Sequence, residues 1–183
     1  MAHRHSLRLQ IALACAGATL LALVVLVADG TRERLIGATL VALLVPVTWI
    51  DLDRRLIPNR LTAAGALAAL AIGLVADPAR LPAQLLWGTA AGGFLLAAAL
   101  IRPDGMGMGD VKLAAVLGLL LESTVVVALL VALVTAALAG AALAIRRGIR
   151  SAREATLPLG PFLALGACVA FAAGAELSEW WLG

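Results

Sequence analysis

Long apolar runs separated by short charged segments dominate this sequence, and seven of them can be delimited. They cover residues 10–28, 35–50, 61–77, 81–101, 111–121, 124–145 and 157–175. Leu, Ala and Val fill these runs over lengths that exceed ordinary strands, which favours helices. Backbone groups inside a bilayer must also be satisfied within the segment, as helices allow. The pattern therefore predicts an all-α polytopic membrane protein with about six or seven transmembrane helices.

The composition supports an integral membrane protein with a single domain over residues 1–183. Hydrophobic residues make up 63% of the chain and charged residues 14%, whereas roughly a quarter of the residues of a soluble domain are charged. A spanning helix needs roughly 20 residues, so the spans leave no length for a second, soluble domain. The basic residues lie in short segments between apolar runs, as in loops that face anionic lipid. We therefore expect the bilayer as a partner and no nucleic acid.

The fifth run, residues 111–121, decides the number of crossings. A helix of this length spans only about 17 Å, so the run is a short or partly inserted helix, or it continues past Glu122. With the amino terminus inside, only three of the fourteen basic residues fall outside, namely Arg32, Arg34 and Arg80. Merging the fifth and sixth runs would move the four arginines of 146–153 outside, against the positive-inside rule. We therefore expect seven crossings of the cell (inner) membrane, with Glu122 at a turn.

The first of two acidic clusters follows the second apolar run and reads DLDRRLIPNRLT over residues 51–62. Asp51 ends the run, so it is expected at the inner boundary of the membrane. Pro58 disfavours a helical conformation in the residue before it, and Asn59 suits the N-cap of the third helix. The alternative is a charged turn beside the membrane, in which the aspartates pair with neighbouring arginines.

The second cluster reads DGMGMGDVKL over residues 104–113. The alternating Gly105, Gly107 and Gly109 would allow a helix or a peptide backbone to approach closely. Asp110 is expected to open the next helix, where it could equally be an N-cap after a flexible loop. A phosphate-binding loop would need a preceding strand and a following Lys-Ser/Thr pair, and the sequence has neither.

Together the clusters indicate an acid–base pair. Two spans separate Asp51 from Asp110 and return the chain to the side it left, so both carboxylates are expected at the same depth. Two neighbouring carboxylates in a low dielectric share a proton, so one acts as a base and the other as an acid. Such a pair can activate water against an amide bond. No HExxH or GxSxG motif and no CxxC pair occurs in the sequence, and we expect neither a metal nor a cofactor.

These residues resemble the type IV prepilin peptidase family, the membrane aspartic proteases that carry a G-x-G-D motif. Residues 51–62 match the family pattern D-x-D-x-x-x-[LI]-P-[DN]-x-L-T, and residues 105–113 match G-M-G-x-G-D-x-K-L. A third element, P-F-G-P-F-L, occurs as PLGPFL over residues 158–163, where Leu159 departs from the usual Phe. The three elements follow one another in the family's order.

The resemblance implies that Asp51 and Asp110 are the catalytic pair of an aspartic endopeptidase at the cytoplasmic face. It implies a prepilin-like substrate, cleaved after a glycine between a short basic leader and a hydrophobic helix. Roles in substrate binding or loop support are expected for Gly107, Gly109, Lys112, Pro58 and Asn59. Long members of the family carry an added cytoplasmic portion with paired CxxC motifs, associated with methylation of the new amino terminus. Because these motifs are missing here, we expect peptidase activity alone.

Two other functions stay open at this point. A small transporter or channel could use the glycine-interrupted segment 105–110 as an ion site, although such sites usually lie near the bilayer midplane. A noncatalytic membrane subunit of a pilus or secretion system would contain similar spans. Asp53 and Asp104 are expected to be loop charges, and the sequence leaves the oligomeric state open.

Overall fold

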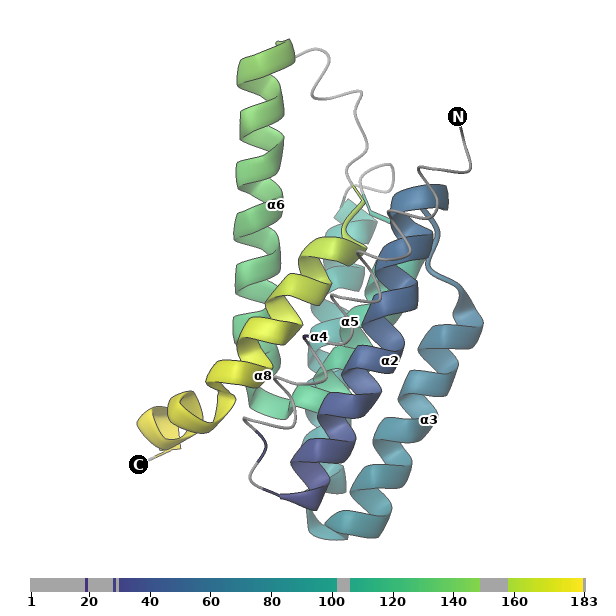
Figure 1. Cartoon of the computed structure of the whole chain (residues 1–183), viewed down its shortest axis with the longest axis vertical. Helices are drawn as coiled ribbons and strands as arrows, with labels where there is room; N and C mark the ends of the chain where they lie inside the picture. Colours follow the sequence, from purple (N-terminus) through teal and green to yellow (C-terminus); the bar gives the residue numbers. More distant parts are fainter. Residues whose placement is uncertain (1–18, 20–27, 29, 102–105, 149–157, 183) are drawn as a thin grey trace.

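The computed structural model of the chain is all-helical over the residues that it describes, which are 19, 28, 30–101, 106–148 and 158–182 (Figure 1). The predicted run 10–28 lies almost entirely outside this part of the chain, as do Asp104 and Gly105. The helices are α2 (Thr31–Arg54), α3 (Asn59–Ala76), α4 (Leu81–Ile101), α5 (Met108–Leu121), α6 (Val125–Arg147) and α8 (Gly160–Leu182), with short 3-10 turns η1 (Pro78–Arg80) and η2 (Glu122–Thr124).

Four helical stretches in the described part of the chain are long and apolar enough to cross a membrane. They are Thr31–Arg54, Asn59–Ala76, Pro78–Ile101 and Met108–Arg146, and a shorter apolar helix covers Gly160–Ala173. These helices are those of an α-helical membrane protein. The count of six or seven spans stays a prediction.

The last of these stretches is broken at Glu122. This residue has a φ of 50°, a value that is uncommon outside glycine and that ends a regular helix. Helix α5 ends directly before it, and α6 begins after the turn η2 and returns along the bundle (Figure 1). The predicted turn at Glu122 is therefore confirmed, and α5 and α6 are separate helices.

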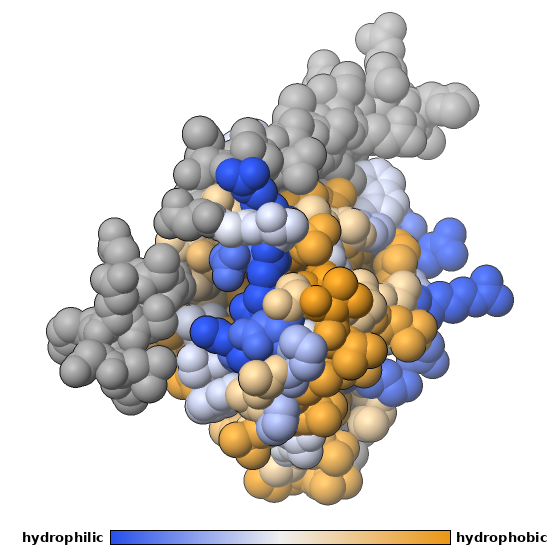
Figure 2. Space-filling view, turned by 90° about the horizontal axis from the view of Figure 1, so that it is seen from below, coloured by the Kyte–Doolittle hydropathy of each residue, from blue (hydrophilic) through white to orange (hydrophobic). Residues whose placement is uncertain are grey.

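Ion pairs connect several helix ends at the lower end of the bundle in Figure 1. Arg32, at the start of α2, pairs with Glu122, and Nη1 of Arg80 lies 3.5 Å from the same carboxylate. Nε of Arg80 lies 3.1 Å from Asp77, which precedes η1. Figure 2 views this end and shows hydrophilic residues gathered beside a broad apolar area. The starts of α2, α4 and α6 therefore lie at one end of the bundle.

Helix α5 is the most enclosed helix, and it packs against α4 through glycines. A methyl group at Gly92 of α4 would lie 2.8 Å from Cβ of Ala115 in α5, and one at Gly88 would lie 2.8 Å from Leu119. Gly118 of α5 in turn lies against the backbone of Trp87 and Gly88. Since lipid tails are as apolar as leucine side chains, such close backbone approach is a main source of helix association in a membrane.

The outward faces of the helices are apolar as well. Large hydrophobic side chains there are mostly accessible, as at Leu67, Val75, Leu100, Leu130 and Ile145. In water such a surface would drive aggregation. In a bilayer it is the surface that lipid covers, which agrees with the membrane assignment.

The adjacent glycines Gly92 and Gly93 allow a matched test of this packing. Gly92 contacts Ala115, whereas a methyl group at Gly93 would meet nothing within 4 Å in the described part of the chain. We expect Gly92→Val to destabilise the protein by about 1–3 kcal/mol through overpacking. Gly93→Val carries the same change in helix propensity and should have a much smaller effect. Thermal unfolding in detergent measures both variants, and equal losses of stability would contradict the proposed role of the glycine contact.

Candidate functional site

Asp51 is a buried carboxylate near the end of α2. Its residue is only 5% exposed, and its Oδ2 accepts a hydrogen bond of 2.9 Å from the backbone N–H of Gly160, the first residue of α8. Helix α2 continues to Arg54 and ends at Arg55, which has a left-handed φ of 53°. Residues 56–58, which follow, have no regular secondary structure, and Pro58 disfavours a helical conformation at Ile57. Asp51 thus lies in the last turns of α2 and faces the start of α8.

Asp110 lies in the first turn of α5 and caps it. Its Oδ2 accepts a hydrogen bond of 3.2 Å from the N–H of Gly107, and its own N–H donates to the carbonyl of Gly107 over 3.1 Å. This reciprocal pair starts the helix at Met108, so α5 begins earlier than the predicted residue 111. A carboxylate in the first turn also interacts favourably with the positive end of the helix dipole.

The structure brings the carboxylates of Asp51 and Asp110 together. The negative charge of Asp51 acts on the half-buried carboxyl group of Asp110 through space. Both groups lie near helix ends, at the end of the bundle opposite the Arg32–Glu122 ion pair. Two like charges that act on each other in a poorly solvated site are costly, so such a pair favours a state with one shared proton.

Gly109 joins the two acidic segments through a direct packing contact. A methyl group at this position would lie 2.8 Å from Cβ of Ile57, a buried residue of the segment after α2. The close approach that the sequence predicts at Gly109 is therefore made by a side chain of the protein itself. Gly107, by contrast, is exposed and has ordinary space for a methyl group.

Asn59 and Lys112 form a second link between these segments. Nζ of Lys112 donates a hydrogen bond of 2.8 Å to Oδ1 of Asn59. The prediction that Asn59 is the N-cap of the third helix is wrong, because Pro58 holds that position and Asn59 is the first helical residue. Pro58 has an extended conformation, with φ −66° and ψ 129°, and its carbonyl accepts the N–H of Leu61 over 3.0 Å. The amide of Asn59 is thereby available to Lys112.

Gly160 is the site residue to which the sequence analysis gave no role. It belongs to the PLGPFL element, which was matched only as a motif, and it lies far from Asp51 along the chain. The signal in the sequence was a glycine directly before a proline at the start of a predicted helix. Its contact with Asp51 depends on how α8 packs beside α2, which local sequence does not indicate.

A metal site does not form in the part of the chain that the structure describes. No group of three His, Cys, Asp or Glu residues there could hold an ion.

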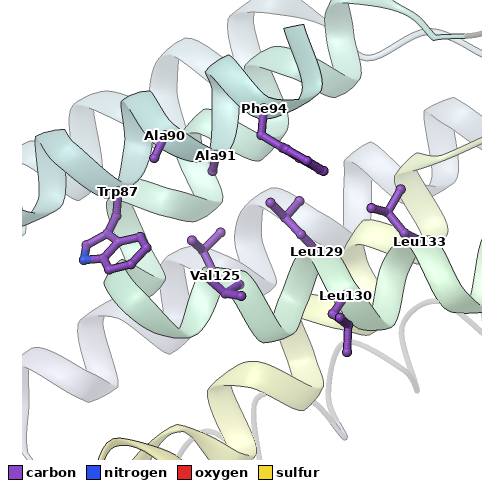
Figure 3. A pocket seen from close by; sticks show the side chains of 9 residues that line it. Trp87, Ala90, Ala91, Phe94, Val125, Leu129, Leu130 and Leu133 are labelled. Carbon is purple, nitrogen blue, oxygen red and sulfur yellow. The ribbon is translucent and has the colours of Figure 1, made fainter. Parts of the chain in front are cut away.

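An apolar pocket lies elsewhere, between α4 and α6 (Figure 3). It has a volume of about 310 Å³ and is lined by Trp87, Ala90, Ala91, Phe94, Val125, Val126, Leu129, Leu130 and Leu133. Its lining includes neither aspartate and no ionisable side chain. The pocket therefore offers shape and apolar surface but no acid–base chemistry.

Comparison with known proteins gives one family. A sequence profile of the type IV leader peptidase family matches residues 38–145. Proteins named prepilin leader peptidase/N-methyltransferase from Aeromonas salmonicida (strain A449) and Aeromonas hydrophila are each 31% identical to the chain over 146 residues. The alignments cover 76% of this chain and 49% of either relative, so the chain spans about half their length. No solved structure matches the chain.

The Asn59–Lys112 hydrogen bond allows the geometry of the site to be tested without any assay of function. We expect a variant with Asn59→Cys and Lys112→Cys, in a background with Cys15→Ser and Cys168→Ala, to be cross-linked by a short bis-thiosulfonate reagent. Mass spectrometry of the digested protein would identify the bridged peptides. A matched pair of Asn59→Cys with Ala79→Cys joins opposite ends of the bundle and should give no bridge. Equal cross-linking of the two pairs would contradict the described packing of α3 against α5.

Proposed function

Because the chain belongs to the type IV leader peptidase family, we propose that it is an aspartic endopeptidase that removes the short basic leader of prepilin-like precursors. The observation that carries this proposal is the carboxylate pair. Asp51 and Asp110 come from helices far apart in the sequence and interact electrostatically in a poorly solvated site. The names of the relatives support the same class of reaction.

The proposed chemistry uses the pair as one unit. The ionised carboxylate takes a proton from a water molecule while the water oxygen attacks the carbonyl carbon of the scissile peptide bond. The protonated carboxyl group donates its proton as negative charge develops on the carbonyl oxygen. When the C–N bond breaks, the leaving amine takes a proton from the pair, and a hydroxyl group of the tetrahedral intermediate returns a proton to the pair. No covalent intermediate with the protein forms. Repulsion between Asp51 and Asp110 favours the singly protonated state from which these proton transfers start.

We assign supporting roles to the residues that join the two acidic segments. The contact of Gly109 with Ile57 and the hydrogen bond between Lys112 and Asn59 both connect the start of α5 to the segment after α2. The N–H of Gly107 binds the carboxylate of Asp110, and we assign Pro58 the role of keeping the segment before α3 extended. Catalytic groups must be held within a fraction of an ångström of their working positions, which such contacts achieve. Lys112, which is exposed beside Asp110, is also available to contact the substrate.

We further propose that the acidic pair lies at the cytoplasmic face of the inner membrane. Exposed basic residues surround this end of the bundle, at Arg54, Arg60 and Arg146. At the opposite end, Arg32 and Arg80 are engaged by acidic partners. Loops rich in Arg and Lys are retained on the cytoplasmic side.

The positions of the carboxylates argue against the transporter alternative. Asp51 lies in the last turns of α2 and Asp110 in the first turn of α5. Ion and substrate sites of transporters usually lie on broken helices near the middle of the bilayer. We propose that residues 1–183 form one peptidase domain.

The carboxylate pair is tested by removing each proton-carrying group. Asp51→Asn and Asp110→Asn should each lower precursor cleavage by about 10³-fold or more, because an amide neither accepts nor delivers the proton. The double variant should be no worse than either single variant, since the two groups act as one unit. The measurement is amino-terminal analysis of a co-expressed precursor that has a basic leader ending in glycine and a following hydrophobic helix.

Asp53→Asn is the matched control for this experiment. The side chain of Asp53 is 66% exposed and lies 3.5 Å from Nε of Arg54, so its loss should leave most of the cleavage activity. Full cleavage by Asp51→Asn, or by Asp110→Asn, would eliminate the aspartic mechanism. Loss of activity at Asp53 with retention at Asp51 would mean that the wrong aspartate was assigned.

The proposed orientation is tested by labelling single cysteines at opposite ends of the bundle. In a background with Cys15→Ser and Cys168→Ala, we expect Ala79→Cys to react with a membrane-impermeant maleimide in intact spheroplasts. Arg60→Cys should react only after the membrane has been opened. Both positions are exposed, so a difference reports the side of the membrane rather than burial. The reverse pattern would place the acidic pair on the other side.

A further inference from the structure

The start of α8 meets the acidic site through a single hydrogen bond. The N–H of Gly160 donates to Oδ2 of Asp51 over 2.9 Å, and both groups are buried. Within the described residues this is the one hydrogen bond that the carboxylate of Asp51 accepts. A buried carboxylate needs such a partner, because loss of hydration is otherwise costly. The contact therefore matters to the site rather than only to the packing of α8.

The first turn of α8 leaves this N–H free for Asp51. Phe162 and Leu163 both direct their N–H groups to the carbonyl of Leu159, over 3.1 and 3.0 Å. Pro161 has no N–H, and proline is well tolerated in a first helical turn. Among the first four residues of α8, Gly160 is thus the donor that points out of the helix. The positive end of the helix dipole lies behind it and favours a negative group at this position.

A glycine is needed here because of Asp51 and not because of the backbone conformation. The positive-φ residues in the described part of the chain are Arg55, Glu122 and Gly148, and Gly160 is not among them. A methyl group at Gly160 would instead lie 2.7 Å from Oδ2 of Asp51 and 3.2 Å from its Cβ and Cγ. These distances are shorter than ordinary contacts, so the aspartate would have to move.

We propose that Gly160 is a positioning residue for the peptidase reaction, holding the carboxylate of Asp51 in its working orientation through its backbone N–H. The inference rests on the proposed function, since it concerns the same carboxylate pair. It makes the PLGPFL element a third part of the site, alongside the segments that carry Asp51 and Asp110. Gly160 acts through Asp51 and does not itself touch the bond that is cleaved.

The contact is tested first without reference to activity, by a double-mutant cycle of thermal stability in detergent. Gly160→Ala should lower the unfolding temperature, because its methyl group collides with Asp51. In an Asp51→Ala background, Gly160→Ala should lower the unfolding temperature much less, because the carboxylate that it collides with is absent. If Gly160→Ala fails to accumulate, Asp51→Ala should restore its accumulation. Gly93→Ala, whose methyl group meets no neighbour within 4 Å, is the control.

The consequence for the reaction is tested by kinetics with the precursor described above. Gly160→Ala should reduce kcat by about 10²-fold with little change in KM, since a catalytic group displaced by about 1 Å loses that much. Gly93→Ala should retain both constants. A purely structural defect would instead reduce the amount of active protein, and active-site titration separates the two.

The outcomes distinguish the inference from the proposed function. Cleavage by the parent chain with unchanged kcat in Gly160→Ala would overturn the positioning role and leave the peptidase proposal intact. Equal stability costs of Gly160→Ala in both backgrounds would overturn it as well. If the parent chain cleaves no precursor, the proposed function fails, and the stability cycle alone decides whether Gly160 positions Asp51.

Discussion

Close backbone approach between α4 and α5 is the constraint on which the site depends. Gly88, Gly92 and Gly118 let the two helices approach until backbone meets backbone. In a bilayer, apolar side chains gain little by leaving lipid for protein, so this contact supplies packing that hydrophobicity alone does not. Helix α5 has only 14 residues and a length of about 21 Å, less than the roughly 30 Å of a hydrocarbon core. Its contact with α4 holds this short helix in place, with Asp110 in its first turn.

The two ends of the bundle use charge in different ways. At one end Arg32, Arg80, Asp77 and Glu122 neutralise one another, which connects the start of α2 with the turns η1 and η2. At the other end Asp51 and Asp110 share one sign and are stabilised by backbone N–H groups, from Gly160 and Gly107 respectively. An ion pair strengthens a fold, whereas two adjacent carboxylates favour a shared proton and with it acid–base chemistry. The first arrangement is structural, and the second has the properties of a reactive site.

Much of the helical framework could be predicted from hydropathy, but helix ends could not. The bounds 81–101 of α4 agree with the prediction, because charged residues flank an unbroken apolar run. Helix α5 begins at Met108 instead of residue 111, since the reciprocal bonds of Asp110 and Gly107 add residues that hydropathy does not count. Asn59 was expected to cap α3, yet its side chain binds Lys112 from another helix. Whether a polar side chain caps its own helix depends on which hydrogen-bond partners the tertiary structure places near it.

The sequence by itself determined that the chain forms apolar helices and that a turn falls at Glu122. It also indicated that two spans lie between Asp51 and Asp110, which returns the two aspartates to the same end of the bundle. These features depend on local composition and on counting spans, which need no knowledge of packing. Only the tertiary structure decided that Gly109 lies on Ile57, that Lys112 binds Asn59 and that Gly160 donates to Asp51. Each of these contacts depends on the rotation of a helix about its axis. An amphipathic helix reveals that rotation in its pattern, but these helices are apolar both toward lipid and toward the core, so their sequences do not.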